Sequence, residues 1–103
     1  MDAGWPVILT PQSQDDLREI VSFIARDDPE RARTFGNTLI DQALFIGTRP
    51  EMGRVVPEQD DSAVREIVYR AYRIIYELCR DPNAVFVLRF WLGARGTPEI
   101  PKA

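Results

Sequence analysis

The side chains of this sequence that are able to do chemistry are arginines, tyrosines and carboxylates. None of the 103 residues is a histidine, and Cys79 is the only cysteine. Histidine is the commonest general base near neutral pH, and structural zinc sites need several cysteine or histidine ligands. We therefore expect neither a zinc site nor a disulfide framework, and any reaction must use arginine, tyrosine or carboxylate groups.

Two glutamates on neighbouring predicted strands, Glu66 and Glu77, have the chemistry of an acid–base pair. A cross-strand ion pair with an arginine explains each of them more simply. Cys79 borders a turn beside Arg80, and no general base lies near it in the sequence, so we interpret it as a small packing residue. These residues alone do not define a catalytic centre.

The aromatic and cationic side chains of the predicted strands can be interpreted as structural or as functional residues. Tyr72 and Tyr76 share a strand face with apolar residues, which favours a place in the core. Arg73 and Arg89 are equally consistent with surface arginines whose stems cover apolar sheet. Trp91 fits either the core or a partner surface, and the sequence does not separate these two readings.

Residues 64–95 predict three consecutive antiparallel strands. Residues 72–78 alternate between an apolar and a mixed face, which is typical of a half-buried strand. Residues 80–83, Arg-Asp-Pro-Asn, predict a turn. In the last strand, period-two alternation places Phe86, Leu88 and Phe90 opposite a second set. That second set is Val85, Val87, Arg89 and Trp91.

The first half of the chain predicts one short strand followed by two helices. Residues 5–9 form an apolar run with Pro6, which is typical of an edge strand. Thr10 and Asp28 are each followed by proline, the pattern of an N-cap and a first helical position. A stripe with helical spacing, formed by Leu17, Ile20, Val21 and Ile24, leaves Asp16 outside it. Gly47 is expected to end the second helix.

The organisation is that of one domain spanning residues 1–103, with a core of about residues 5–96. Residues 48–62 contain two prolines and a polar run, so we expect an extended surface connector there. Residues 97–103 are punctuated by proline and predict a flexible tail. The fold class is α+β, with element order β-α-α-β-β-β and a helical hairpin packed on an antiparallel sheet.

The net charge is −3, and its distribution is uneven. Residues 1–61 hold twelve acidic and six basic residues, whereas residues 62–97 hold six arginines and three acidic residues. The overall charge argues against binding driven by bulk attraction to nucleic acid. No signal peptide or membrane-spanning run is evident, so we expect a cytoplasmic protein.

Several short motifs occur in one order along the chain. They are Leu9-Thr10-Pro11, Ile24-Ala25-Arg26-Asp27, Pro29-Glu30-Arg31-Ala32, Pro50-Glu51-Met52-Gly53-Arg54, Arg65-Glu66-Ile67, Tyr72-Arg73-Ile74-Ile75-Tyr76, Leu88-Arg89 and Gly93-Ala94-Arg95. With this order and spacing, residues 5–96 resemble the ParE branch of the ParE/RelE toxin superfamily, the toxins of type II toxin–antitoxin modules.

The resemblance implies a small toxin neutralised by direct binding of a ParD-like antitoxin encoded beside it, as in plasmid stabilisation modules. In the ParE branch the target is usually DNA gyrase, bound without a metal or cofactor, and in the RelE branch it is mRNA on the ribosome. RNA cleavage needs a base, an acid and cations. This sequence supplies only the cations, and it reads Trp91-Leu92-Gly93 where many relatives read Trp-His-Gly.

We therefore expect a gyrase inhibitor that is not an enzyme and does not bind nucleic acid sequence-specifically. A ribosome-dependent mRNA endonuclease and an inactive antitoxin partner that serves as co-repressor are the alternatives. The resemblance assigns target binding to Arg73, Arg89, Trp91 and Arg95. It also favours antitoxin binding on the helices, where we select Phe23, Phe35 and Phe45.

Overall fold

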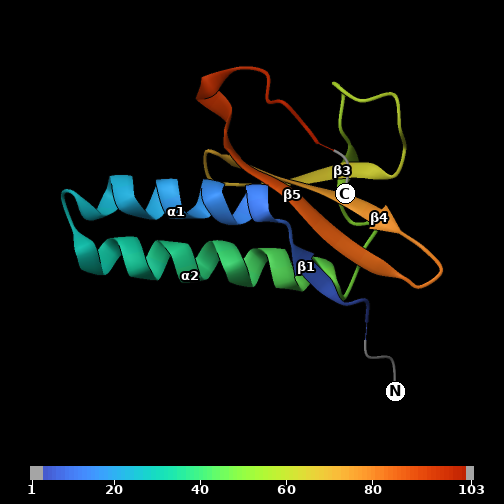
Figure 1. Cartoon of the computed structure of the whole chain (residues 1–103), viewed down its shortest axis with the longest axis horizontal. Helices are drawn as coiled ribbons and strands as arrows, with labels where there is room; N and C mark the ends of the chain where they lie inside the picture. Colours follow the sequence, from blue (N-terminus) through green and yellow to red (C-terminus); the bar gives the residue numbers. More distant parts are fainter. Residues whose placement is uncertain (1–3, 102–103) are drawn as a thin grey trace.

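Two helices pack side by side along one face of a twisted sheet (Figure 1). The structure is a computed structural model and describes residues 4–101. Its elements are β1 (Val7–Leu9), α1 (Pro11–Ala25), α2 (Pro29–Ile46), β2 (Arg54–Val55), β3 (Val64–Tyr69), β4 (Tyr72–Cys79), β5 (Ala84–Leu92) and the short 3-10 helix η1 (Gly93–Arg95). The α+β class and the helical hairpin on a sheet are confirmed.

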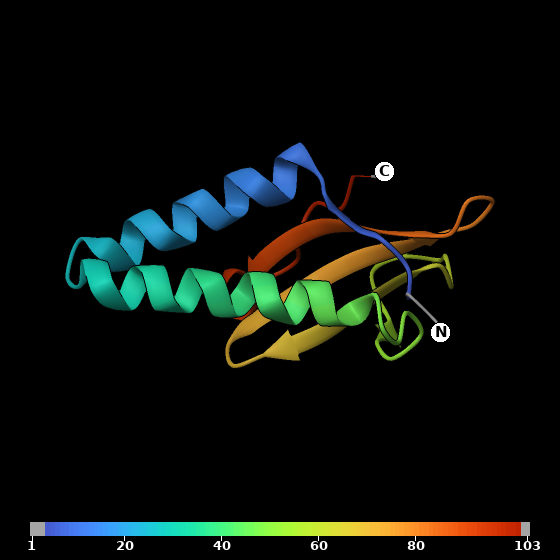
Figure 2. The same cartoon turned by 90° about the horizontal axis from the view of Figure 1, so that it is seen from below.

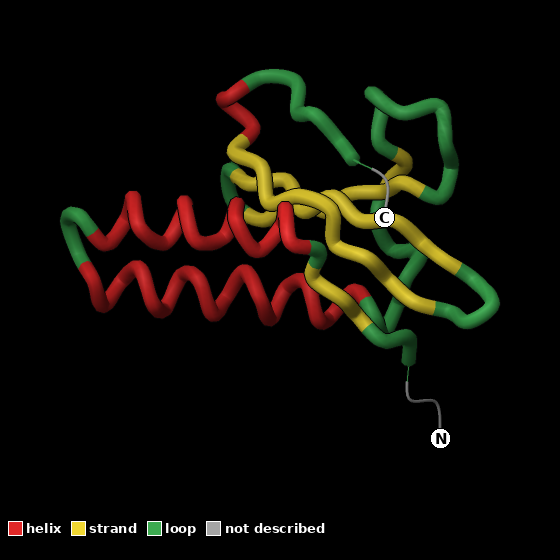
Figure 3. The backbone as a smooth tube through the Cα atoms, viewed as in Figure 1, coloured by secondary structure: helices red, strands yellow, loops and turns green. Residues whose placement is uncertain are grey.

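The sheet has five strands in the order β1-β5-β4-β3-β2, coloured yellow in Figure 3. The strands β2 to β5 pair antiparallel, as expected, but β1 pairs with β5 in parallel, so the sheet is mixed. β2 lies inside the segment that we expected to be a plain connector. With only two residues, it is too short to leave a strand pattern in the sequence.

Both helices begin where the sequence predicts. The Thr10 hydroxyl accepts a hydrogen bond from the Ser13 amide, and the Asp28 carboxylate accepts one from the Arg31 amide. Gly47 ends α2 with an ordinary φ of −60°, so a left-handed conformation is not the reason for glycine. A Cβ there would lie 2.4 Å from the Trp5 carbonyl oxygen, and only glycine allows this close approach of the two backbones.

The main core lies between the hairpin and the sheet, and Figure 2 shows the two helices covering that face. Its buried members come from α2, β4 and β5. They are Leu39, Ala43, Ile46, Ile74, Tyr76, Leu78, Val85, Val87 and Phe90. The alternation predicted for residues 72–78 therefore holds, since Ile74, Tyr76 and Leu78 all face the helices.

The alternation predicted for the last strand holds through Leu88, which shares a face with Phe86, and is wrong beyond that residue. Tyr76 pairs with Val87 and Ile75 pairs with Arg89, so Leu88 is an extra residue in β5. Such a bulge shifts the side chains that follow it by one position. Val87 and Phe90 therefore share the helix-facing core, which simple period-two alternation does not allow.

A second apolar cluster covers the opposite face of the sheet. It contains Val56, Val64, Ile75, Leu88 and Trp91, with Ile100 packed against it. The segment that we expected to be a flexible tail therefore contacts the sheet through Ile100 and the Glu99 carbonyl, and Pro98 is also buried. Residues 102 and 103 lie outside the described residues.

Candidate functional site

Trp91 is the centre of the arginine cluster that the resemblance assigns to target binding. The guanidinium carbons of Arg89 and Arg95 lie 4.8 Å and 4.6 Å from its ring centroid. Arg73 is the residue opposite Trp91 on β4. The structure thus brings all four predicted residues together where the start of β4 lies beside the end of β5 and η1 follows.

Arg89 is held by α1. Its Nε and Nη2 donate to the two carboxylate oxygens of Asp16 at 2.8 Å and 2.9 Å, and its Nη1 donates to the Glu99 carbonyl at 2.7 Å. Both side chains of this pair are about nine-tenths buried. All three nitrogen atoms of the guanidinium are therefore already bonded within the chain, which leaves Arg89 little capacity to bind a target.

Arg73 is also held by carboxylates, on the face of the sheet away from the helices. Its Nη1 and Nη2 donate to Glu58 at 3.0 Å and 2.7 Å, and its Nε donates to Glu66. The hydrogen bonds from Arg73 hold the pKa of the Glu58 carboxyl below its ordinary value. The same bonds raise the pKa of the Arg73 guanidinium. We conclude that Arg73 ties the connector to the sheet.

Glu66 and Glu77 do not behave as an acid–base pair. Glu66 is fully buried and binds Arg54 as well as Arg73. Its partners across the sheet are Arg54 and Ile75, whereas Glu77 pairs with Val64 and Phe86. The ion-pair interpretation of Glu66 is therefore confirmed.

Tyr76 is a structural residue, as its strand face indicated. Its hydroxyl donates to the Pro50 carbonyl at 2.8 Å and accepts from the Gly53 amide at 2.9 Å. The side chain is fully buried, and burial raises the pKa of its hydroxyl. Tyr76 is thus unsuited to proton transfer near neutral pH.

Arg95 differs from the other two arginines of the cluster. It is exposed on η1, forms no ion pair within residues 4–101, and stacks its guanidinium on the Trp91 ring. Trp91 is itself fixed, because its indole N–H donates to the Gly96 carbonyl at 2.9 Å. Arg95 is therefore the member of the cluster that is accessible to another molecule.

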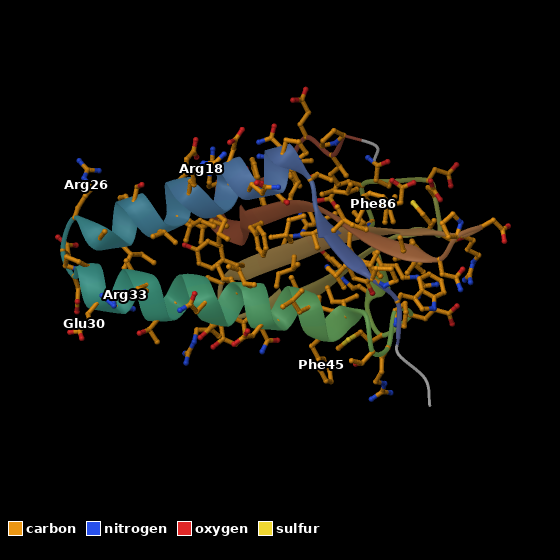
Figure 4. All side chains as sticks on the ribbon, turned by 60° about the horizontal axis from the view of Figure 1, so that its bottom comes forward. Arg18, Arg26, Glu30, Arg33, Phe45 and Phe86 are labelled. Atoms are coloured by element: carbon orange, nitrogen blue, oxygen red, sulfur yellow. The ribbon has the colours of Figure 1, made fainter. Side chains whose placement is uncertain are left out.

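The three phenylalanines selected for antitoxin binding do not form one surface. Phe23 on α1 and Phe45 on α2 are 66% and 51% exposed, and Figure 4 shows Phe45 pointing away from the sheet. Phe35 is half-buried, because its ring packs on Tyr72 and Tyr69 at centroid distances of 5.5 Å and 6.2 Å. It belongs to the packing between helix and sheet.

Sequence reasoning missed the carboxylates that hold the arginines. Asp16 appeared to lie outside the apolar stripe of α1, yet it is 6% exposed and also accepts the Phe90 amide at 3.1 Å. No local signal marks such a residue, since the partners that bury it, Arg89 and Phe90, are more than seventy positions away. Glu58 was likewise hidden in the polar run of the connector.

Within 4–101, no three histidine, cysteine, aspartate or glutamate side chains are grouped so that they could hold a metal ion. In the same range, neither helix combines the length and the apolar character needed to cross a bilayer.

Comparison with known proteins identifies similar chains. Residues 7–96 match the family model described as ParE toxin of the type II toxin–antitoxin system parDE. A chain of the chromosomal ParDE system from P. aeruginosa has a TM-score of 0.71 at 15% identity, over 88% of this chain and 98% of that one. No curated protein matches significantly.

A second solved structure has a similar fold. A chain of the RelBE2 toxin–antitoxin complex from Mycobacterium tuberculosis has a TM-score of 0.65 at 16% identity. The match covers 87% of this chain and 92% of that one. At these identities the likeness to both structures concerns the fold.

Proposed function

We propose that this chain, which belongs to the ParE toxin family of type II toxin–antitoxin systems, arrests growth by binding DNA gyrase and is neutralised by a ParD-like antitoxin. The observation that carries the proposal is the state of the arginine cluster. Two of its three arginines are bonded to carboxylates, and one exposed cation remains beside a fixed tryptophan. Such a site suits binding better than catalysis.

The carboxylate partners argue against RNA cleavage by this cluster. A phosphate would have to displace Glu58 from Arg73 or Asp16 from Arg89. Each of these pairs is bidentate, with two charge-assisted hydrogen bonds. The cleavage would also need a base and an acid near the same atoms. Tyr76, whose hydroxyl is buried and bonded twice, does not supply them.

Arg95 and Trp91 have the character of a binding hot spot. Arginine and tryptophan are enriched among the residues that dominate protein interfaces. The stacked geometry orders the Arg95 side chain before binding, which reduces the entropy lost in the complex. We assign target contact to Arg95, supported by Trp91, and we assign Arg73 and Arg89 the role of holding the surrounding framework.

The antitoxin is the second partner in this proposal. Both structural neighbours come from toxin–antitoxin systems. Phe23 and Phe45 expose large apolar rings on the hairpin, and exposed apolar rings of this size often mark interaction sites. The proposal places both partners in the cytoplasm and needs no metal or cofactor.

The test is induction of the toxin in cells that lack the antitoxin. Plasmid supercoiling, DNA breaks and the integrity of translated mRNA are followed in the same cultures, and purified toxin is added to a gyrase supercoiling assay. We expect supercoiling to be lost or DNA breaks to appear while mRNA stays intact. The Arg95→Ala variant should lose this effect, and Arg33→Ala on α2 is the matched control.

The alternatives give different results in the same experiment. Rapid cleavage of translated mRNA with intact DNA would replace the proposal with a ribosome-dependent endonuclease. Growth unaffected by a folded, induced toxin would indicate an antitoxin partner without toxicity.

A further inference from the structure

The turn between β3 and β4 holds an arginine in a backbone conformation that its side chain does not favour. The two strands pair as far as Tyr69 and Tyr72, so Arg70 and Ala71 alone form the turn. Arg70 has a φ of 54°, in the left-handed region. Glycine, asparagine and aspartate dominate such turn positions, because the Cβ of other residues comes too close to a backbone carbonyl oxygen. Arginine therefore occupies this position at a conformational cost.

The contacts of Arg70 within the chain do little to offset that cost. Its side chain is exposed, and within residues 4–101 it forms no ion pair. Its guanidinium carbon lies 5.6 Å from the centroid of the Tyr69 ring, and an exposed cation–π contact of this kind is weak. Residues held in strained backbone conformations cluster at functional sites. The strain at Arg70 thus directs attention to its side chain.

Arg70 resembles Arg95, the residue to which we assign target contact. Both are exposed, neither has a carboxylate partner in the part of the chain that the structure describes, and each lies over an aromatic ring. Both rings are themselves fixed. The Trp91 ring is held by the hydrogen bond of its indole N–H, and the Tyr69 ring packs on Phe35. The same local arrangement therefore occurs twice.

The two arginines lie at the same end of the sheet. The Ala71 carbonyl accepts a hydrogen bond from the Gly93 amide at 2.9 Å. Ala71 follows Arg70 in the turn, and Gly93 begins η1, which ends at Arg95. The segments that carry the two arginines are therefore bonded to each other through their backbones. Figure 3 shows this turn and η1 at the same end of the sheet.

The two guanidinium groups approach this end of the sheet from opposite faces. The Tyr69 ring, under Arg70, packs against the core on the helix side, whereas Trp91, under Arg95, belongs to the apolar cluster on the other face. Arg95 also lines a groove of about 670 Å³ between α1, β5 and η1, and Arg70 lies outside its lining. The cationic surface therefore extends beyond the groove, across the end of the sheet.

Two guanidinium groups without internal partners are suited to carboxylates. Each presents a planar fork of N–H donors, which binds a carboxylate through two parallel hydrogen bonds. Phosphates also fit this fork, but binding to nucleic acid depends on many cations acting together. The net charge of −3 opposes such binding. The arrangement therefore favours acidic side chains on a protein surface.

We propose that Arg70 is a second contact residue for the protein target, and that Arg70 and Arg95 together bind acidic side chains on its surface. The strained turn places a cation at the tip of the hairpin, beside η1, where a residue better suited to the turn would carry none. The inference rests on the proposed function for the identity of the target, DNA gyrase. It adds a contact residue and the chemistry of the surface that this residue recognises.

Arg70→Gly separates stability from function. Glycine adopts a positive φ freely, so the midpoint of thermal unfolding should not fall. Loss of the guanidinium should nevertheless raise the toxin concentration needed for half inhibition of gyrase supercoiling by about tenfold or more. Growth arrest in cells that lack the antitoxin should be relieved in parallel. A purely structural role for Arg70 would not lower activity while stability is kept.

Further variants at the same position test the charge. Arg70→Lys keeps the charge but not the planar fork, so its activity should lie between those of the unchanged chain and Arg70→Gly. Arg70→Glu should be weaker than Arg70→Gly, because it places like charges together. The matched control is Arg33→Ala, which removes one exposed arginine from α2 and should inhibit like the unchanged chain. Circular dichroism verifies the fold of each variant.

Several outcomes would overturn the inference. These are full gyrase inhibition by Arg70→Gly, an equal loss in Arg33→Ala, or a loss of activity that comes with a lowered unfolding midpoint. Binding of a free DNA duplex by the purified toxin that Arg70→Gly abolishes would assign the surface to nucleic acid instead.

Failure of the proposed function gives a different result. In that case the unchanged chain arrests growth while gyrase stays active, so the target is another protein. Growth arrest by Arg70→Gly then decides the inference, since arrest that is lost supports the contact role and arrest that is retained overturns it.

Discussion

Asp16 on α1 binds Arg89 on β5 through two hydrogen bonds in a buried site, and it also accepts the backbone amide of Phe90. The reason lies in the length of β1, which covers only residues 85–87 of its neighbour. Beyond that point the edge of β5 has no strand beside it. The carboxylate of Asp16 satisfies the exposed amide there, and thus fixes α1 against the sheet.

Removal of the Asp16 carboxylate should be strongly destabilising. Asp16→Ala leaves the Arg89 guanidinium and the Phe90 amide buried without their acceptor, and the expected cost is about 3–5 kcal/mol of unfolding free energy. Urea denaturation measures it. Asp15→Ala, which removes an exposed carboxylate one position away, should cost no more than about 0.5 kcal/mol. Equal losses in the two variants would contradict the assigned role.

Substitution of Phe35 should lower stability, whereas substitution of Phe45 should lower antitoxin affinity. Phe35→Ala removes a ring that packs on Tyr69 and Tyr72, so we expect a loss of about 2 kcal/mol in unfolding free energy. Phe45→Asp alters an exposed residue and should leave stability nearly unchanged while weakening the antitoxin complex. Thermal unfolding and titration calorimetry with the antitoxin separate the two effects. An unchanged affinity of Phe45→Asp would remove Phe45 from the antitoxin surface.

The ion pair of Glu58 with Arg73 should make stability depend on pH. The pKa of Glu58 is lowered from its ordinary value of 4.5 in the folded chain, mainly by the hydrogen bonds from Arg73. Its stabilising effect is therefore complete above the unfolded pKa and is lost as pH falls through the folded pKa. At neutral pH, Glu58→Gln should cost at most about 1 kcal/mol, because the pair is partly exposed.

The stability difference between Glu58→Gln and the unchanged chain should therefore narrow as the pH falls from neutral to acid. Urea denaturation at about pH 7 and about pH 3 gives the two differences. Asp41→Asn, a change of an exposed carboxylate on α2, serves as the control. A stability gap for Glu58→Gln that is equally large at both pH values would show that Arg73 does not set the pKa.

Tyr76 should anchor the connector through its hydroxyl. Tyr76→Phe leaves the Pro50 carbonyl and the Gly53 amide without that partner, at a cost of about 1–3 kcal/mol. Faster hydrogen exchange at the Gly53 amide should accompany this loss. Tyr69→Phe, a change in a ring that packs on Phe35, is the comparison. Unaltered exchange at Gly53 would mean that the loop is held by other contacts.

Local chemistry made most of the fold predictable. The caps at Thr10 and Asp28 placed the helices, alternation located β4, and β-branched and aromatic residues located β5. Two features depended on long-range pairing and left no local pattern. One is the two-residue β2. The other is the bulge at Leu88, which adds one residue to β5 relative to β4, and the sequence does not give the pairing register of these strands.

The candidate site was predictable only in part. The order of motifs indicated Trp91 and the three arginines around it, and the structure places these four residues together. The sequence did not indicate which of the arginines is free to bind a target. That depends on Asp16 and Glu58, which are distant in sequence from their arginine partners and look like ordinary surface carboxylates. Sequence reasoning also missed the groove between α1, β5 and η1, because these elements are distant in sequence and meet only in the folded chain.

The hydrogen bonds of the Thr10 hydroxyl have a consequence for folding during translation. The hydroxyl caps α1 and also donates to the Val87 carbonyl at 2.8 Å, across 77 positions of the chain. On the ribosome, the hydrogen bonds that join β1 and Thr10 to β5 can form only after β5 has emerged. Native structure thus arises late in translation, and a nascent chain interrupted before β5 has neither the Trp91 cluster nor a completed sheet.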